Sequence, residues 1–169
     1  MSTLTQPGTV LSVSLSLHPG VPKYPQPEIH IGEFGVDGDF HAGPINRHKK
    51  TDGKEPNQRQ LTIVAQEALN SLNQILGTHL EAGSIGENIL VDGLGDLGVL
   101  VAGDRIWIGS DVILRVTSQN KPCATLNVYH PQIIKHLIGM RGVTAVVEHG
   151  GTVKPGDSII IDETNSPHD

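Results

Sequence analysis

The sequence predicts a single, mainly β domain with some α structure, whose sheet is strongly curved or closed into a barrel. Three observations lead to this prediction. A chain of 169 residues suits one domain of ordinary size. Its 20 Gly and 11 Pro are spread along the chain, as expected for many short elements joined by turns. With only 1 Trp, 2 Tyr and 2 Phe, the core must be built from Val, Ile and Leu, which favour strands.

Apolar or alternating runs bounded by Gly, Asp or Pro predict where the strands lie. In residues 10–17 (VLSVSLSL), leucine and valine alternate with serine, so we expect a buried apolar face and an exposed serine face. Further strands are predicted at residues 89–94, 105–109, 112–118, 143–148 and 158–161. The segments that are rich in Pro, charge and amide side chains are predicted to be loops, at residues 18–28 and 43–59.

Two helices complete the predicted elements. The first covers about residues 65–76, where apolar residues recur at helical spacing, and Gly77 supplies its C-cap. The second covers residues 131–138, with Pro131 at its first position and Gly139 at its end. Short links and only two helices favour a closed sheet over a doubly wound parallel one, with an open α+β sheet as the alternative. We expect the domain to cover residues 8–161 and a tail to cover residues 162–169.

Composition and charge argue against several classes of protein. No apolar run reaches the roughly 18 residues of a membrane span, and the first residues lack the basic and apolar regions of a secretory signal. We therefore expect a cytoplasmic protein outside the membrane. A net charge of -6 argues against nucleic-acid binding. Residues 93–98 match G-x-G-x-x-G, but a strand pattern follows instead of the helix that a dinucleotide site needs.

Cys123 is the only cysteine, so the chain can form neither an internal disulfide nor a cysteine-based structural zinc site. It lies between a predicted strand and the second predicted helix, and we expect it in a loop at the mouth of a cleft. Lys121 and a nearby helix N-terminus would favour its thiolate, and Pro122 would stiffen the segment. A reactive sulfur is one interpretation. The other is a buried cysteine that acts as a small hydrophobe.

Six short phrases occur in order along the chain: GDFHAG (38–43), RQLT (59–62), GSIGENI (83–89), GDR (103–105), PC (122–123) and GD (156–157). Together they resemble the MOSC domain, the family related to the C-terminal part of molybdenum cofactor sulfurases, over about residues 8–161. The resemblance implies a β-barrel-like mixed fold, an intracellular setting and independence of pyridoxal phosphate. It also implies a cysteine that either carries sulfur as a persulfide or ligates molybdenum in the pterin cofactor. Similar small stand-alone members are associated with reduction of N-hydroxylated compounds.

The resemblance assigns roles to particular residues. Cys123 would be a catalytic residue and the molybdenum ligand, and His41 would be a catalytic proton donor. The residues that would bind the cofactor are Lys121, Asn120, Glu87, Asn88 and Arg59. Asn120 stands where many members have arginine, and a lysine at 121 cannot reproduce the bidentate geometry of that guanidinium. Simpler interpretations remain open: a turn histidine at position 41, and turn-forming polar residues at 87 and 88.

Residues 47–59 are basic for an acidic protein. The basic residues of this segment are Arg47, Lys49, Lys50, Lys54 and Arg59. They would attract the phosphate of a pterin cofactor, although a solvated loop explains them equally well. An oxidoreductase would need a small-molecule substrate and a separate flavin or iron-sulfur reductase, because the chain lacks cluster cysteines. The alternative is a sulfur or cofactor carrier with a transfer partner. Either version is compatible with a homo-oligomer.

Overall fold

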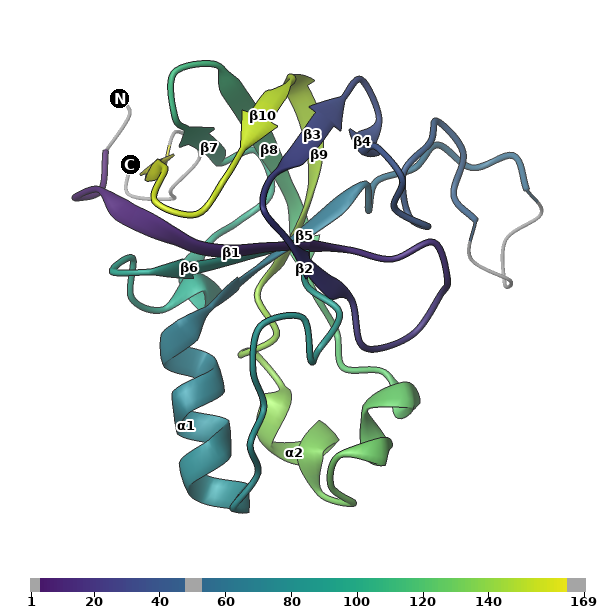
Figure 1. Ribbon diagram of the computed structural model, residues 1–169, viewed down its shortest axis with the longest axis vertical. Coiled ribbons are helices and arrows are strands. Elements are labelled where there is room, and N and C mark those ends of the chain that lie inside the picture. The colour runs from purple at the N-terminus through teal and green to yellow at the C-terminus, as the bar shows by residue number, and fades with distance from the viewer. Residues whose placement is uncertain (1–3, 48–52, 164–169) are drawn as a thin grey trace.

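A closed barrel forms the centre of the computed structural model, which describes residues 4–47 and 53–163 (Figure 1). The strands of the main sheet are β1 (Gly8–Leu15), β2 (Tyr24–Gln26), β5 (Leu61–Ala65), β6 (Ile89–Asp92), β7 (Arg105–Ile108), β8 (Val112–Gln119), β9 (Val143–His149) and β11 (Ser158–Asp162). Their order is β11-β7-β8-β9-β5-β6-β1, and pairing of β1 with β11 closes the ring. β2 adds to β1 outside the ring. The predicted mainly β, barrel-like fold is confirmed, and the open sheet is excluded.

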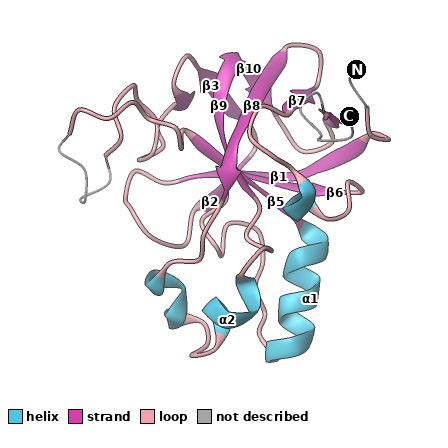
Figure 2. Cartoon of the chain, turned by 180° about the vertical axis from the view of Figure 1, so that it is seen from behind, coloured by secondary structure: helices cyan, strands magenta, loops and turns pink. Residues whose placement is uncertain are grey.

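Two smaller groups of elements flank the barrel. A second sheet contains β3 (Ile29–Gly32), β4 (Gly35–Val36) and β10 (Gly151–Val153). The helical elements are α1 (Gln66–Leu76), η1 (Leu97–Val99), η2 (Ala124–Val128) and α2 (Ile133–Leu137). Figures 1 and 2 show α1 and α2 together at one end of the barrel and the second sheet at the other. None of the helices in the described part of the chain is long and apolar enough to cross a membrane.

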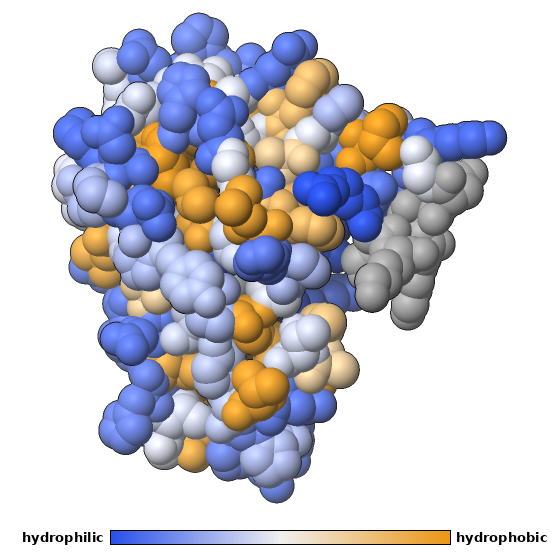
Figure 3. Space-filling model, turned by 45° about the vertical axis from the view of Figure 1, so that its right-hand side comes forward, coloured by the Kyte–Doolittle hydropathy of each residue, from blue (hydrophilic) through white to orange (hydrophobic). Residues whose placement is uncertain are grey.

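The apolar core has two parts. Inside the barrel, strand residues such as Val10, Ile63 and Leu114 are fully buried. Beneath the helices, Leu69 and Leu72 of α1 pack in a cluster with residues of η2 and α2. Large exposed hydrophobic side chains are scattered over several elements, and Figure 3 shows hydrophobic residues interspersed with hydrophilic ones on the face it presents. The expected homo-oligomer stays a prediction.

The predicted faces of the first strand are wrong in part. Leu11 and Leu17 are 39% and 71% exposed, whereas Ser14 and Ser16 are 2% and 5% exposed. The register between β1 and β6 shifts after Val10. Such a bulge inserts one residue and sends the following side chains to opposite faces, which a strict period-two pattern does not show.

The two predicted helices were located with unequal accuracy. Gly77 ends α1 as predicted, with a φ of 66° and an N–H that donates to Asn73 O. The second helix is shorter than residues 131–138, because Pro131 lies in a turn in which the Ile133 N–H donates to His130 O. The sequence patterns also gave no indication of β2, β3, β4, β5, β10, η1 and η2. β5 (LTIVA) runs directly into α1, and periodicity does not separate a short buried strand from the start of a helix.

Candidate functional site

Cys123 lies in the loop between β8 and η2, at the N-cap position of η2. It is a free, exposed cysteine, so the interpretation as a buried hydrophobe is wrong. The backbone N–H and hydroxyl of Thr125 lower the pKa of the Cys123 thiol, and the charge of Arg141 lowers it further against the opposing effect of burial. The start of η2 therefore favours the thiolate, as expected. The cation that lowers the thiol pKa is Arg141, whereas Lys121 had been expected. Lys121 has an exposed side chain, and its backbone carbonyl accepts a hydrogen bond from Arg141.

Arg141 is a buried cation beneath the cysteine loop. It lies between α2 and β9 and is only 9% exposed. Its Nη1 donates to Lys121 O over 2.8 Å, and its Nη2 donates to Ile85 O over 3.2 Å. Burial lowers the pKa of Arg141, whereas Cys123 raises it. The guanidinium thus joins the segment before Cys123 to the loop 83–87.

A second guanidinium comes from Arg59. Its Nη2 donates to Asn120 Oδ1 over 2.8 Å, and Asn120 is held by its own N–H, which donates to Gly142 O. Asn120 is therefore a buried acceptor where the resemblance had suggested arginine. The positive charge of Arg59 lowers the pKa of Arg141. Two guanidiniums consequently lie around the segment that carries Cys123.

Glu87 is a buried carboxylic acid, with 2% exposure, in the loop 83–87 that Arg141 contacts. Burial raises the pKa of Glu87 to about 7, although the backbone N–H groups of Gly83 and Ile85 and the charge of Arg141 oppose it. Oε2 accepts a hydrogen bond from the Gly83 N–H over 2.6 Å, and Oε1 is buried without a partner among the described residues. Glu87 is therefore a proton-exchanging group near neutral pH.

Asn88 holds strands together. It is 1% exposed; its Nδ2 donates to Ser14 O, and its Oδ1 accepts the Thr62 N–H. These bonds link the loop before β6 to β1 and β5. The structure gives Asn88 a structural role, and its predicted contact with a cofactor stays a prediction.

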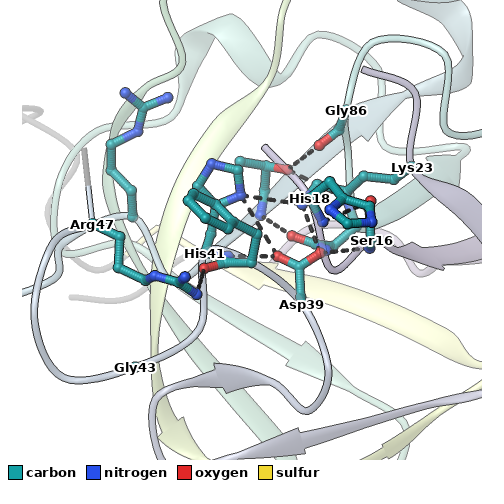
Figure 4. A network of polar contacts seen from close by, with 12 residues as sticks. Ser16, His18, Lys23, Asp39, His41, Gly43, Arg47 and Gly86 are labelled. Carbon is teal, nitrogen blue, oxygen red and sulfur yellow. Dashed lines mark hydrogen bonds and ion pairs between the residues drawn. The ribbon is translucent and has the colours of Figure 1, made fainter. Parts of the chain in front are cut away.

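His41 belongs to a network with Lys23 and Asp39, whose side chains point toward one another in Figure 4. Lys23 Nζ donates to Asp39 Oδ1 over 2.6 Å and lies 3.1 Å from His41 Nδ1. Asp39 also accepts the backbone N–H groups of Ser16 and His41. Burial raises the pKa of Asp39, but contacts with His41, Lys23 and Ser16 hold that pKa well below its ordinary value. Asp39 is ionised, and burial lowers the pKa of Lys23 while Asp39 opposes that effect.

Asn57 connects the His41 network to the cysteine loop. Its Nδ2 donates to His41 O over 2.7 Å, and its Oδ1 accepts the Arg59 N–H over 3.0 Å. A chain of hydrogen bonds therefore runs from His41 through Asn57 and Arg59 to Asn120, three residues before Cys123. Glu87 joins the same region through its electrostatic interactions with Lys23 and Arg141.

The predicted basic segment contributes unevenly to this region. Arg59 is part of it, whereas Arg47 donates to Phe40 O and lies 4.0 Å above the Phe40 ring. Lys54 is exposed. Lys49 and Lys50 lie outside the described residues. Of the described basic residues, Arg59 lies in this region, and the attraction of a cofactor phosphate stays a prediction.

Cys123 was expected at the mouth of a cleft. A cavity of about 360 Å³ lies between α1 and the segments 95–98 and 139–142, and another of about 330 Å³ lies beside residues 33–43. Cys123 lines neither of them. Within residues 4–47 and 53–163, no three His, Cys, Asp or Glu side chains are grouped to hold a metal ion.

The sequence patterns gave no indication that Lys23, Asn57 and Arg141 belong to the site. Lys23 falls in a Pro-rich stretch that looks like a loop, and Arg141 lies two residues after Gly139, which ends the second predicted helix. Their partners are distant in the chain: Asp39 is 16 residues from Lys23, and Ile85 is 56 residues from Arg141. Asp39 carried a signal only as part of the phrase GDFHAG.

Comparison with known proteins matches this chain to a family. The family model described as the MOSC domain matches residues 37–160. The YuaD protein of Bacillus subtilis (strain 168), whose name refers to metal-sulfur cluster biosynthesis, is 31% identical over 146 residues, with 74% of each chain covered.

Solved structures share the fold. The crystal structure of Bacillus subtilis YuaD matches with a TM-score of 0.82 and 24% identity, over 96% of this chain and 99% of that one. YiiM from Geobacillus stearothermophilus matches with a TM-score of 0.66 and 19% identity, over 91% and 74% of the two chains. YiiM from Escherichia coli gives a TM-score of 0.66 and 20% identity, over 93% and 70%. With the family model spanning most of the barrel and YuaD above 30% identity, the chain belongs to the MOSC domain family.

Proposed function

We propose that this protein binds molybdenum cofactor through Cys123 and reduces an N-hydroxylated small molecule in the cytoplasm. The observation that carries the proposal is the exposed Cys123 thiol, whose pKa is lowered by the backbone N–H and hydroxyl of Thr125 and further by the charge of Arg141. The MOSC family is linked to domains of molybdenum cofactor sulfurases, which supports this cofactor over others. The substrate class rests on the resemblance to small family members.

The donor set fits the cofactor. A thiolate is a soft ligand suited to molybdenum, and a single protein ligand fits a metal that brings further ligands with its pterin. Arg59 and the exposed Lys121 are cations able to bind the pterin phosphate, while Asn120 orients Arg59 through the bond to its Nη2. Glu87 and Asn88 remain predicted cofactor contacts, and both are buried. When bound, the cofactor would supply the electrons of the reduction.

Protons must come from the protein or from water. Reduction of an N-hydroxyl group to N–H and water consumes two electrons and two protons. His41 is half-exposed and next to a buried ion pair, so it can deliver one proton to the departing hydroxyl and regain it from solvent. A separate flavin or iron-sulfur reductase would return electrons after each turnover.

The test is a comparison of metal content and activity. The protein is produced in a host that makes the cofactor, molybdenum is measured per chain, and reduction of an N-hydroxylated compound is assayed with an artificial electron donor. We expect stoichiometric molybdenum and turnover, both lost in Cys123→Ser. Asn127→Ser, an exposed change in η2, is the matched control and should keep both. Full metal and activity in Cys123→Ser contradicts the proposal.

A sulfur carrier is the second candidate function. The exposed, low-pKa thiol is also suited to accept sulfur from a desulfurase as a persulfide. The name of YuaD refers to metal-sulfur cluster biosynthesis, which favours this candidate. Intact mass measurement distinguishes the two: one extra sulfur on Cys123, removed by a reductant, with no molybdenum and no turnover, supports the carrier.

A further inference from the structure

Lys23 is a buried lysine that is held both by its backbone and by its side-chain ammonium group. Its residue exposure is 2%. Its backbone N–H donates to Gly83 O over 2.9 Å, and its carbonyl lies where a side chain at Gly83 would be, so only glycine fits there at a φ of +86°. A charged lysine is buried only when it is paired. Asp39, with a fully buried side chain, provides that pair.

The carboxylate of Asp39 accepts hydrogen bonds from three other donors. Oδ1 accepts from the Ser16 N–H and from Lys23 Nζ, and Oδ2 accepts from the backbone N–H of His41. His41 Nδ1 lies 3.6 Å from Oδ2, which is too long for a hydrogen bond. The partner of His41 Nδ1 is therefore Lys23 Nζ, at 3.1 Å.

That contact determines which ring nitrogen carries the proton. An ammonium group has three N–H donors and no acceptor, so His41 Nδ1 must accept and cannot itself be protonated. We propose that Lys23 is a positioning residue that holds His41 as the neutral imidazole with its proton on Nε2. The edge-to-face contact with Phe40, at 5.4 Å between ring centroids, further fixes the ring plane.

The consequence concerns proton donation: because Nδ1 accepts from Lys23, the Nε2 proton can leave only if Lys23 Nζ passes a proton to Nδ1 in the same step, which keeps the ring neutral. The side chain of His41 is 42% exposed and Nδ1 faces the buried Lys23, so Nε2–H is the ring group left to meet a ligand. A neutral histidine of the other tautomer would present an acceptor there instead. The proton-donor role rests on the proposed function, whereas the tautomer does not.

The protein contains its own references for the measurement. His149 Nδ1 lies 2.7 Å from Asp111 O, and a carbonyl only accepts, so neutral His149 is protonated on Nδ1. His130 Nδ1 accepts the Gln132 N–H over 3.0 Å, so neutral His130 is protonated on Nε2. Two histidines of known and opposite tautomer therefore appear in the same spectrum.

The experiment is a long-range ¹H–¹⁵N correlation spectrum of the ¹⁵N-labelled protein without cofactor, at about pH 8, where unperturbed histidines are neutral. We expect His41 to show the pattern of His130, with the proton on Nε2, and not that of His149. In Lys23→Met the pattern should change to a mixture of both tautomers. Lys121→Met, which removes an exposed lysine, is the control and should leave His41 unchanged.

Lys23→Met leaves Asp39 buried without its partner, so the double variant Lys23→Met/Asp39→Asn serves if the single variant fails to fold. A proton on Nδ1 of His41 in the unmodified protein overturns the inference, and so does an unchanged pattern in the folded Lys23 variant. If the tautomer is as inferred but turnover per bound molybdenum is unchanged in the variant, the proton-donor role fails and the positioning role stands.

Discussion

Cys123 and His41 each lie beside a cation, but the two cations are held in different ways. Arg141 is anchored by backbone carbonyls, and the thiol that it influences is exposed. Lys23 is anchored by a carboxylate, and this ion pair is completely buried. Exposed charges are screened by water and salt, whereas a buried charge that loses its partner is strongly destabilising. The cysteine region can therefore change its chemistry at little cost in folding, while the histidine network is part of the folded framework.

The largest effect should follow from breaking the buried pair. We expect Lys23→Met to lower the free energy of unfolding by about 3–5 kcal/mol, because Asp39 is left as an uncompensated buried charge. Urea denaturation measures the loss. Lys23→Met/Asp39→Asn should recover part of it, and a double variant no more stable than the single one would show that the charge is not the cause.

The second-largest expected effect is a pH dependence of folding stability, caused by the buried acid Glu87. Its pKa is about 7 in the folded protein and near 4.5 in the unfolded chain, so its contribution to stability is present below about pH 4.5 and is lost as pH rises through 7. Glu87→Gln should therefore increase stability at pH 8 by about 1–3 kcal/mol, since one pKa unit corresponds to about 1.4 kcal/mol. Denaturation midpoints at pH 5 and pH 8 test this.

Glu81→Gln is the control for this prediction, because Glu81 is an exposed acid of the same segment. It should leave the difference between the two pH values intact. A difference that persists in Glu87→Gln would assign the pH dependence to another group.

At Cys123 we expect a smaller effect, on the reactivity of the thiol and not on the stability of the fold. Thr125→Val removes the hydroxyl that lowers the pKa of the thiol. Alkylation by iodoacetamide at about pH 7 should slow roughly 2–5-fold, because interactions of partly exposed groups are worth about 0.2–1 kcal/mol. The exposed Thr9→Val is the matched control. An alkylation rate equal to that of the control would show that the Thr125 hydroxyl does not lower the pKa of the thiol.

Arg59→Lys should have the smallest effect on the folded protein. It keeps the charge and loses the planar donor to Asn120, so we expect stability within about 0.5 kcal/mol of the original. Molybdenum content should fall if the guanidinium binds the cofactor. Calorimetry and metal analysis on one preparation separate the two quantities, and a large loss of stability would make Arg59 a structural residue like Lys23.

Sequence patterns predicted the parts of the molecule that depend on neighbouring residues. The Gly77 cap and the strands β7, β8, β9 and β11 follow from local turns and apolar runs. The buried serines of β1 do not, because a bulge in the pairing with β6 changes the faces. Within the site, Cys123 stood out as a chemically distinctive residue. Lys23 and Arg141 are buried and paired only when segments distant in the chain meet. Patterns of neighbouring residues in a single sequence do not predict such contacts.

Closure of the barrel links strands that are far apart in the chain. Gly8 of β1 pairs with Ile159 of β11, so β1 is synthesised well before the strand that completes its pairing. Until β11 arrives, the edge of β1 that faces it presents unpaired backbone groups, which are prone to bind other extended chains. Long-range pairing of this kind raises contact order and slows folding. During translation, the edge of β1 that will pair with β11 is therefore open to association with other chains.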